Sequence, residues 1–97
     1  MVDYVLSDRA KKDLIDIWQY TFNRWSRNQA DFYTRKLLDA CAFISTAPEL
    51  VGISYEYVLS GYKAFLVGKH LIFYKMLNGK VFIVRILHQR MDVERNL

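Results

Sequence analysis

The fold is decided by residues 62–88, which read YKAFLVGKHLIFYKMLNGKVFIVRILH. Apolar and polar residues alternate in this stretch, and β-branched and aromatic side chains dominate it, which is typical of β-strands. Asn78-Gly79 interrupts the alternation and favours a two-residue type I′ turn, because both of its positions need positive φ. The stretch therefore predicts antiparallel strands at about 54–59, 62–67, 70–77 and 80–87.

The same turn predicts the register of the last two strands. Leu77 is expected opposite Lys80, Tyr74 opposite Ile83 and Ile72 opposite Arg85. Because side chains alternate between the two faces of a sheet, each face can be listed. One face would hold His70, Ile72, Tyr74, Ile83 and Arg85, and the other Leu71, Phe73, Val84 and Ile86. The second face is purely apolar, so it is expected under the helices, with Arg85 presented outward.

The first half of the chain predicts a short strand and two helices. Residues 2–6 have a strand pattern, and Ser7 then has the character of an N-cap for a helix over 8–25. Ser26 followed by Gln29 is a capping-box pattern that starts a second helix over about 27–46, and Pro48 ends it. Since the connection between the two helices is very short, they should be antiparallel neighbours.

Apolar residues recur at helical spacing along both segments. The first stripe holds Ala10, Leu14, Ile17, Trp18, Thr21 and Trp25, and the second holds Ala30, Tyr33, Leu37, Cys41 and Ile44. Core packing is the expected role of these side chains. The sequence therefore predicts a single α+β domain over 1–97, with a short N-terminal strand, an antiparallel helical hairpin and an antiparallel β-meander, the helices lying on one face of the sheet.

Composition narrows the class of protein. The chain has 97 residues, of which 53% are hydrophobic, and this argues against disorder. Its net charge of +4 is uneven, since residues 49–97 carry most of it and residues 57–91 contain no Asp or Glu. Two features account for this uneven charge, a basic surface that is simply exposed to solvent or a surface that binds an anionic partner. No secretion signal or membrane-length apolar run is present, so we expect a cytoplasmic protein.

The sequence gives little support for a metal site, a bound cofactor or a reactive thiol. The single cysteine, Cys41, excludes an internal disulfide and is expected to be buried rather than nucleophilic. His70, His88 and Cys41 lack ligand spacing, so no metal site is expected. No glycine-rich phosphate loop precedes a helix, and no cofactor is expected.

A metal-independent ribonuclease is the enzyme class that the residue types allow. Such a site needs a base, an acid and cations around the phosphate, and suitable types are present in Arg85, His88, Arg90, Lys63 and Tyr74. A histidine beside an arginine is nevertheless more often a binding or structural residue than a catalyst. Arg85 also has a structural alternative, which is to pair with Asp92 or with a helix carboxylate.

The order of residues along the chain resembles ParE toxins of the RelE/ParE superfamily. The resemblance begins at Tyr4, Leu6, Ser7, Ala10, Asp13, Leu14, Ile17, Trp18 and Tyr20. It continues through Trp25, Ala30, Tyr33, Leu37, Pro48 and Gly52, and through Gly61, Tyr62, Phe65, Val67, Ile72 and Tyr74. It ends with residues 84–88, Arg90 and Asp92. Met91 departs from the family pattern, which often has a second arginine there.

The resemblance implies the toxic component of a type II toxin–antitoxin module. Such toxins are associated with inhibiting DNA gyrase by trapping the gyrase–DNA cleavage complex, and a cognate antitoxin neutralises them in a hetero-oligomeric complex. A binding poison rather than an enzyme is therefore expected. The alternative is a RelE-like, ribosome-dependent mRNA endonuclease that uses Arg85, His88 and Tyr74.

Two sets of contact residues follow from this hypothesis. The contacts with gyrase or its DNA are expected from Arg85, His88, Arg90, Lys63 and Tyr74. The contacts with the antitoxin are expected on the helices, at Tyr20, Phe22 and Trp25.

Overall fold

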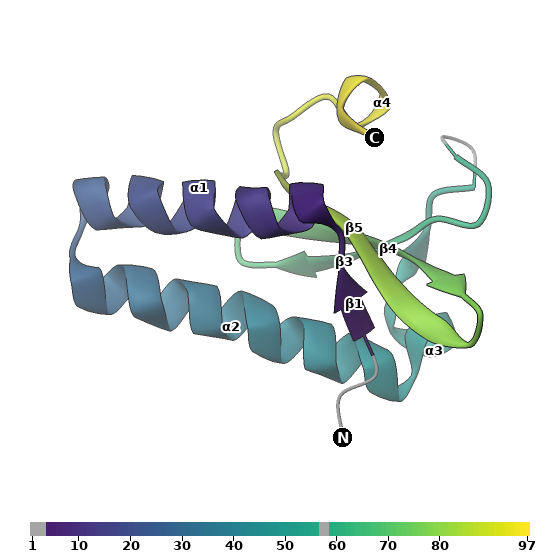
Figure 1. Cartoon of the computed structure of the whole chain (residues 1–97). Coiled ribbons are helices and arrows are strands. Elements are labelled where there is room, and N and C mark those ends of the chain that lie inside the picture. Colours follow the sequence, from purple (N-terminus) through teal and green to yellow (C-terminus); the bar gives the residue numbers. More distant parts are fainter. Residues whose placement is uncertain (1–3, 57–58) are drawn as a thin grey trace.

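The computed structural model describes residues 4–56 and 59–97. In chain order its elements are β1 (Tyr4–Leu6), α1 (Asp8–Arg24), α2 (Arg27–Thr46), α3 (Pro48–Val51), β2 (Ile53–Ser54), β3 (Lys63–Val67), β4 (His70–Leu77), β5 (Lys80–His88) and α4 (Val93–Asn96). Figure 1 shows α1 and α2 side by side and antiparallel, joined at the end away from the sheet. The predicted α+β class is confirmed.

The sheet has the strand order β1-β5-β4-β3-β2. Strands β2 to β5 form the predicted antiparallel meander, and β1 adds to β5 in parallel, so the sheet is mixed. The strand predicted over 54–59 is wrong in extent, because β2 comprises two residues, Ile53 and Ser54. The predicted starts at residues 2 and 3, and residues 57 and 58, lie outside the described residues.

Local capping signals explain where the helices begin. The Oγ atom of Ser7 accepts the N–H of Ala10 at 3.0 Å, and that of Ser26 accepts the N–H of Gln29 at 3.1 Å. Each cap satisfies a backbone donor that has no partner within its helix. Both caps are confirmed, as is the positive φ of 52° at Asn78 and 78° at Gly79 in the β4–β5 turn.

A β-bulge in β5 changes the expected faces of the sheet. Leu77 lies opposite Lys80 and Tyr74 opposite Ile83, as predicted, but Phe73 then lies opposite Arg85. Val84 is the extra residue between these pairs, and one extra residue moves every later side chain to the other face. The predicted pairing of Ile72 with Arg85 is therefore wrong, since Ile72 lies opposite Ile86.

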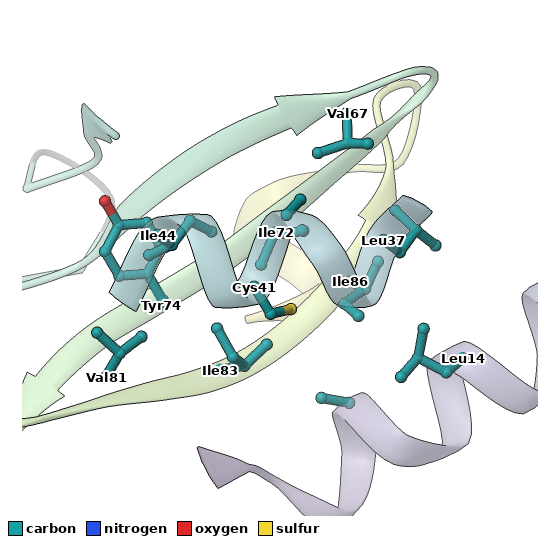
Figure 2. Packing of buried hydrophobic residues seen from close by; sticks show 12 residues of the cluster. Leu14, Leu37, Cys41, Ile44, Val67, Ile72, Tyr74, Val81, Ile83 and Ile86 are labelled. Carbon is teal, nitrogen blue, oxygen red and sulfur yellow. The ribbon is translucent and has the colours of Figure 1, made fainter. Parts of the chain in front are cut away.

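The helices cover the sheet face that was predicted to be exposed. The buried core joins Leu37, Cys41 and Ile44 of α2 to Ile72, Tyr74, Val81, Ile83 and Ile86 of the sheet. Figure 2 shows these side chains meeting between α2 and the strands. The bulge places Ile86 on this face in place of Arg85. The prediction that the face of Leu71 and Phe73 lies under the helices is therefore wrong, since both belong to the cluster on the opposite face.

The opposite face has a smaller cluster of its own. Ala64, Phe73 and Leu87 are buried there, and Tyr55, Leu71, Val93 and Leu97 pack against them. Val93 begins α4, so the C-terminal segment covers part of this face. Among the described residues, no helix has both the length and the apolar character needed to cross a membrane.

Candidate functional site

Arg85 is part of the fold and is not presented outward. Its Nε and Nη2 atoms donate to the two carboxylate oxygens of Asp13 at 2.8 and 2.9 Å, and its Nη1 donates to the carbonyl oxygen of Asn96 at 2.7 Å. These bonds to Asp13 raise the pKa of Arg85. Arg85 is 8% exposed, so the expectation that it faces a target is wrong. Its structural alternative, a pair with a helix carboxylate, is what the structure shows.

The position of Asp13 has a topological cause. Strand β1 ends at Leu6, opposite Ile83, so the edge of β5 has no strand partner beyond that point. Ser7 donates to the carbonyl oxygen of Val84 at 2.7 Å, and Asp13 accepts the N–H of Ile86 at 2.9 Å. Side chains of α1 and its N-cap thus provide the hydrogen-bond partners that a neighbouring strand would otherwise give to this part of β5. Arg85 balances the negative charge of Asp13.

Tyr74 and Lys63 lie away from the C-terminal cluster. Tyr74 is 0% exposed, and its Oη donates to the carbonyl oxygen of Pro48 at 2.6 Å, so the expected outward position of Tyr74 is wrong. Burial raises the pKa of Tyr74. Lys63, opposite Tyr74, lines a cavity of about 380 Å³ that also includes Glu49. His70 and Tyr74 are four residues apart on β4, a distance of about 13 Å along a strand.

His88 and Arg90 do come together, and they have two basic neighbours. The β3–β4 turn meets the end of β5, where the N–H of Gln89 donates to the carbonyl oxygen of Lys69 at 2.9 Å. His70 lies opposite His88, with ring centroids 5.3 Å apart and planes at 81°. We call the side chains of Lys69, His70, His88 and Arg90 the basic corner. Both Lys69 and Arg90 are exposed, and both histidines are partly buried.

The bulge explains why the sequence did not predict this corner. With regular pairing from the Asn78-Gly79 turn, His70 would lie opposite Leu87, on the face away from His88. The extra residue in β5 shifts the pairing by one and brings the two imidazoles together. The available signal was the turn itself, which places the β3–β4 connection beside the end of β5.

Helix α2 contributes Tyr33 to the base of the corner. The Oη of Tyr33 lies 2.6 Å from Nδ1 of His70 and accepts the N–H of Lys69 at 3.3 Å. Burial, and then the neighbouring His88, lower the pKa of His70 to about 4, while Asp13 acts in the opposite direction. His70 is therefore neutral at pH 7, and the permanent positive charges of the corner are those of Lys69 and Arg90.

The residues expected to face the antitoxin are exposed but do not share one surface. Tyr20 is 58% exposed, Phe22 44% and Trp25 71%. Tyr20 and Phe22 point roughly 200° apart around α1, because each residue turns a helix by about 100°. Trp25 was expected to be buried, which is wrong, because α1 ends at Arg24 and Trp25 lies at its C-cap. Phe22 stacks on Trp18 with centroids 5.2 Å apart.

Phe22 and Trp25, without Tyr20, belong to an apolar stripe along α1 whose side chains are exposed except for the half-buried Trp18, and we call this stripe the aromatic surface. It comprises Ile15, Trp18, Phe22 and Trp25, which follow one another at spacings of three or four residues. The indole Nε1 of Trp18 donates to Asp31 of α2 at 2.8 Å, which fixes the ring at the junction of the helices.

Comparison with known proteins assigns the family. The family model described as the ParE toxin of the type II toxin–antitoxin system, parDE, matches residues 4–93. The chain belongs to the ParE toxin family. Toxin ParE1 of Mycobacterium tuberculosis is 39% identical over 95 residues, which cover 97% of this chain and 96% of that protein. Toxin ParE1 of Caulobacter vibrioides is 39% identical over 97 residues, which cover 100% of this chain and 99% of that protein.

A solved structure supports the same fold. A chain described as the chromosomal ParDE TA system from P. aeruginosa superposes with a TM-score of 0.80 and 14% identity, covering 91% of this chain and 96% of that chain. The ParE family membership makes the present chain the toxin of a type II toxin–antitoxin system, which implies an antitoxin as partner.

Proposed function

We propose that this ParE family toxin acts in the cytoplasm by inhibiting DNA gyrase, holding the enzyme–DNA cleavage complex through the basic corner. The observation that carries the proposal is the corner itself. Exposed Lys69 and Arg90 flank two imidazoles, and residues 57–91 contain no carboxylate. A cationic surface of this kind favours contact with DNA phosphates or with a protein that holds them.

The chemistry required of the corner is binding. Lys69 and Arg90 supply charge to phosphate oxygens, and His88 supplies a hydrogen-bonding ring between them. A poison that stabilises one state of gyrase needs no turnover, because tighter binding to the cleaved complex shifts its population. Relative to the sequence hypothesis, His88 and Arg90 remain as contacts, Lys69 joins them, and Lys63 becomes a separate contact on the other end of the sheet.

The ribonuclease alternative is less well supported by this geometry. Two of its three residues, Arg85 and Tyr74, are buried and donate their hydrogen bonds to the protein itself. Neither can reach a phosphate without disrupting the core. The remaining residue, His88, serves a binding role equally well.

Neutralisation is assigned to the aromatic surface. Trp25 and Phe22 are among the exposed apolar side chains of the helical hairpin. An amphipathic segment of the antitoxin that covers them would remove apolar area from water. The functional unit in the cell would then be a hetero-oligomeric toxin–antitoxin complex.

The two target classes are separated by one paired experiment. Purified toxin is added to gyrase with supercoiled plasmid and, in parallel, to a translating lysate. The proposal predicts linear plasmid trapped covalently on gyrase and intact message. Truncated message with unchanged plasmid would overturn it in favour of the endonuclease. If two phosphate contacts are made, the affinity should fall by about tenfold between 50 and 200 mM salt.

A further inference from the structure

A tyrosine hydroxyl and two imidazoles form a continuous contact chain from α2 to the basic corner. Tyr33 contacts Nδ1 of His70, the rings of His70 and His88 meet edge to face, and the N–H of Arg90 donates to Nδ1 of His88 at 3.1 Å. Tyr33 lies outside the basic corner, and His70, although a member of it, was given no contact with the target above. The chain therefore links the helical layer to the exposed end of β5.

The hydroxyl of Tyr33 is tightly enclosed. It lies 2.6 Å from His70 and 3.4 Å from the carbonyl oxygen of Val67, and it accepts the N–H of Lys69. Gly68 has a φ of +57°, and a Cβ atom there would come within 2.9 Å of this oxygen. The β3–β4 turn is thus folded around the Tyr33 hydroxyl, which fixes both Lys69 and His70.

One hydrogen bond of this chain has a fixed direction, because a backbone N–H can only donate. Because Nδ1 of His88 accepts from the backbone of Arg90 at 3.1 Å, the proton of a neutral His88 ring lies on Nε2. Nε2 of His88 is therefore a donor. The Tyr33 hydroxyl bonds to Nδ1 of His70 and also lies 3.4 Å from the carbonyl oxygen of Val67, so its single proton has two acceptors within reach and this contact does not assign the His70 tautomer.

We propose that Tyr33 and His70 are positioning residues for the target contact of the toxin, since they hold the His88 ring and the Arg90 backbone in the geometry that binds. The inference rests on the proposed function, because it takes the basic corner as the contact. A ring that is already fixed loses less conformational entropy on binding, and a misplaced ring loses its hydrogen bond. Tyr33 and His70 act through His88 and need not touch the target.

The charged and titratable groups around His70 agree with this role. Tyr33 faces it from α2, His88 faces it from β5, Lys69 precedes it in the chain, and Asp13 of α1 acts on it electrostatically. Protonation of His70 would place a charge beside the His88 ring, whose centroid lies 5.3 Å away. The neutral ring is thus the one that suits this close pair of imidazoles.

Three variants test the proposal. Tyr33→Phe removes the hydroxyl, His70→Leu removes the ring nitrogen that bonds to it, and His70→Asn retains a side-chain amide that can bond to the hydroxyl as donor or acceptor. The first readout is the nitrogen–proton spectrum of the free toxin, which reports the tautomer of His88 and the amide of Arg90. The second is the amount of linear plasmid trapped on gyrase. Far-UV circular dichroism checks that each variant is folded.

Positioning predicts that Tyr33→Phe and His70→Leu shift the His88 and Arg90 signals and lower trapping by about tenfold, the effect of one lost hydrogen bond. His70→Asn should keep both readouts within about threefold. Unchanged spectra in folded Tyr33→Phe and His70→Leu would overturn the proposal, and so would equal losses for His70→Asn and His70→Leu. If either large change prevents folding, the other variant and His70→Asn decide.

Failure of the proposed function gives a different result. If wild-type toxin traps no plasmid on gyrase, gyrase is not the target, and the amount of trapped plasmid no longer tests the variants. The spectra of the free toxin then decide alone whether Tyr33 and His70 order the His88 ring. Shifted signals support the positioning role, and unchanged signals overturn it.

Discussion

The pair formed by Asp13 and Arg85 should contribute strongly to the stability of the fold, and substituting Asp13→Ala tests this. In the wild type the carboxylate accepts two bonds from Arg85 and one from the N–H of Ile86. Asp13→Ala leaves a buried guanidinium without its counter-charge and a backbone donor without a partner. Breaking a buried ion pair costs about 3–5 kcal/mol, and a lone buried N–H costs about 1–3 kcal/mol. Because the two effects share one group, we expect a total of about 4 kcal/mol.

The same helix provides a matched control. Asp16 pairs with Lys12 at 3.0 Å, but their side chains are 56% and 74% exposed. Water screens such a pair, so Asp16→Ala should change the free energy of unfolding by less than about 1 kcal/mol. The measurement is urea denaturation followed by far-UV circular dichroism at pH 7. A small domain has about 5–15 kcal/mol of stability in total, so Asp13→Ala should remove a large fraction of it and lower the urea midpoint well below that of Asp16→Ala.

A double variant separates the charge from the packing. Asp13→Leu with Arg85→Met removes both charges and retains apolar volume, so it should recover much of the loss. The N–H of Ile86 still lacks its acceptor, so recovery will be incomplete. The reasoning is refuted if Asp13→Ala is no more destabilising than Asp16→Ala, because Arg85 would then be free to serve elsewhere.

Three further predictions concern other parts of the molecule. The pKa of His70 is about 4 in the folded protein, against 6.5 for an ordinary histidine. The unfolded chain therefore binds the proton more readily, so the free energy of unfolding is highest above pH 6.5 and falls as the pH drops toward 4. Urea denaturation at the two ends of this range should show a contribution of about 1–2 kcal/mol, allowing for partial exposure, that His70→Asn removes. Gly52→Ala should cost about 1–3 kcal/mol, because its Cβ would overlap the Tyr74 hydroxyl; thermal unfolding should show a smaller cost in a Tyr74→Phe background, and an equal cost would contradict the cause. Phe22→Ala and Trp25→Ala should each weaken antitoxin binding by about tenfold in calorimetry while changing stability by about 0.5 kcal/mol or less; unchanged affinity would remove the aromatic surface from the interface.

The parts of the fold that were predictable depend on neighbours in the chain. Ser7 and Ser26 cap helices three residues away, and Asn78-Gly79 adopts the positive φ values of its turn. The bulge at Val84 has no comparable local signal, because an alternating pattern looks the same until the partner strand is known. The parallel addition of β1 and the α4 cover also depend on contacts between distant segments.

In the candidate site too, only features that depend on residues close together in the chain were predictable. His88 and Arg90 were expected, and the structure brings them together. Arg85 was assigned to the target because its partner, Asp13, lies 72 residues earlier in the chain. Lys69, His70 and Tyr33 join the corner through strand pairing and helix packing, which the spacing of residues in one sequence does not encode.

The most direct test of the central claim removes charge from the basic corner and compares it with equal removal elsewhere. Lys69→Ala with Arg90→Ala is compared with Lys12→Ala and Lys36→Ala, which change the net charge equally on exposed helix positions. The measured quantity is linear plasmid trapped covalently on gyrase. We expect the corner variant to lose at least about tenfold and the helix variant to match the wild type. Equal trapping by both variants would contradict the assignment of this corner as the contact with gyrase.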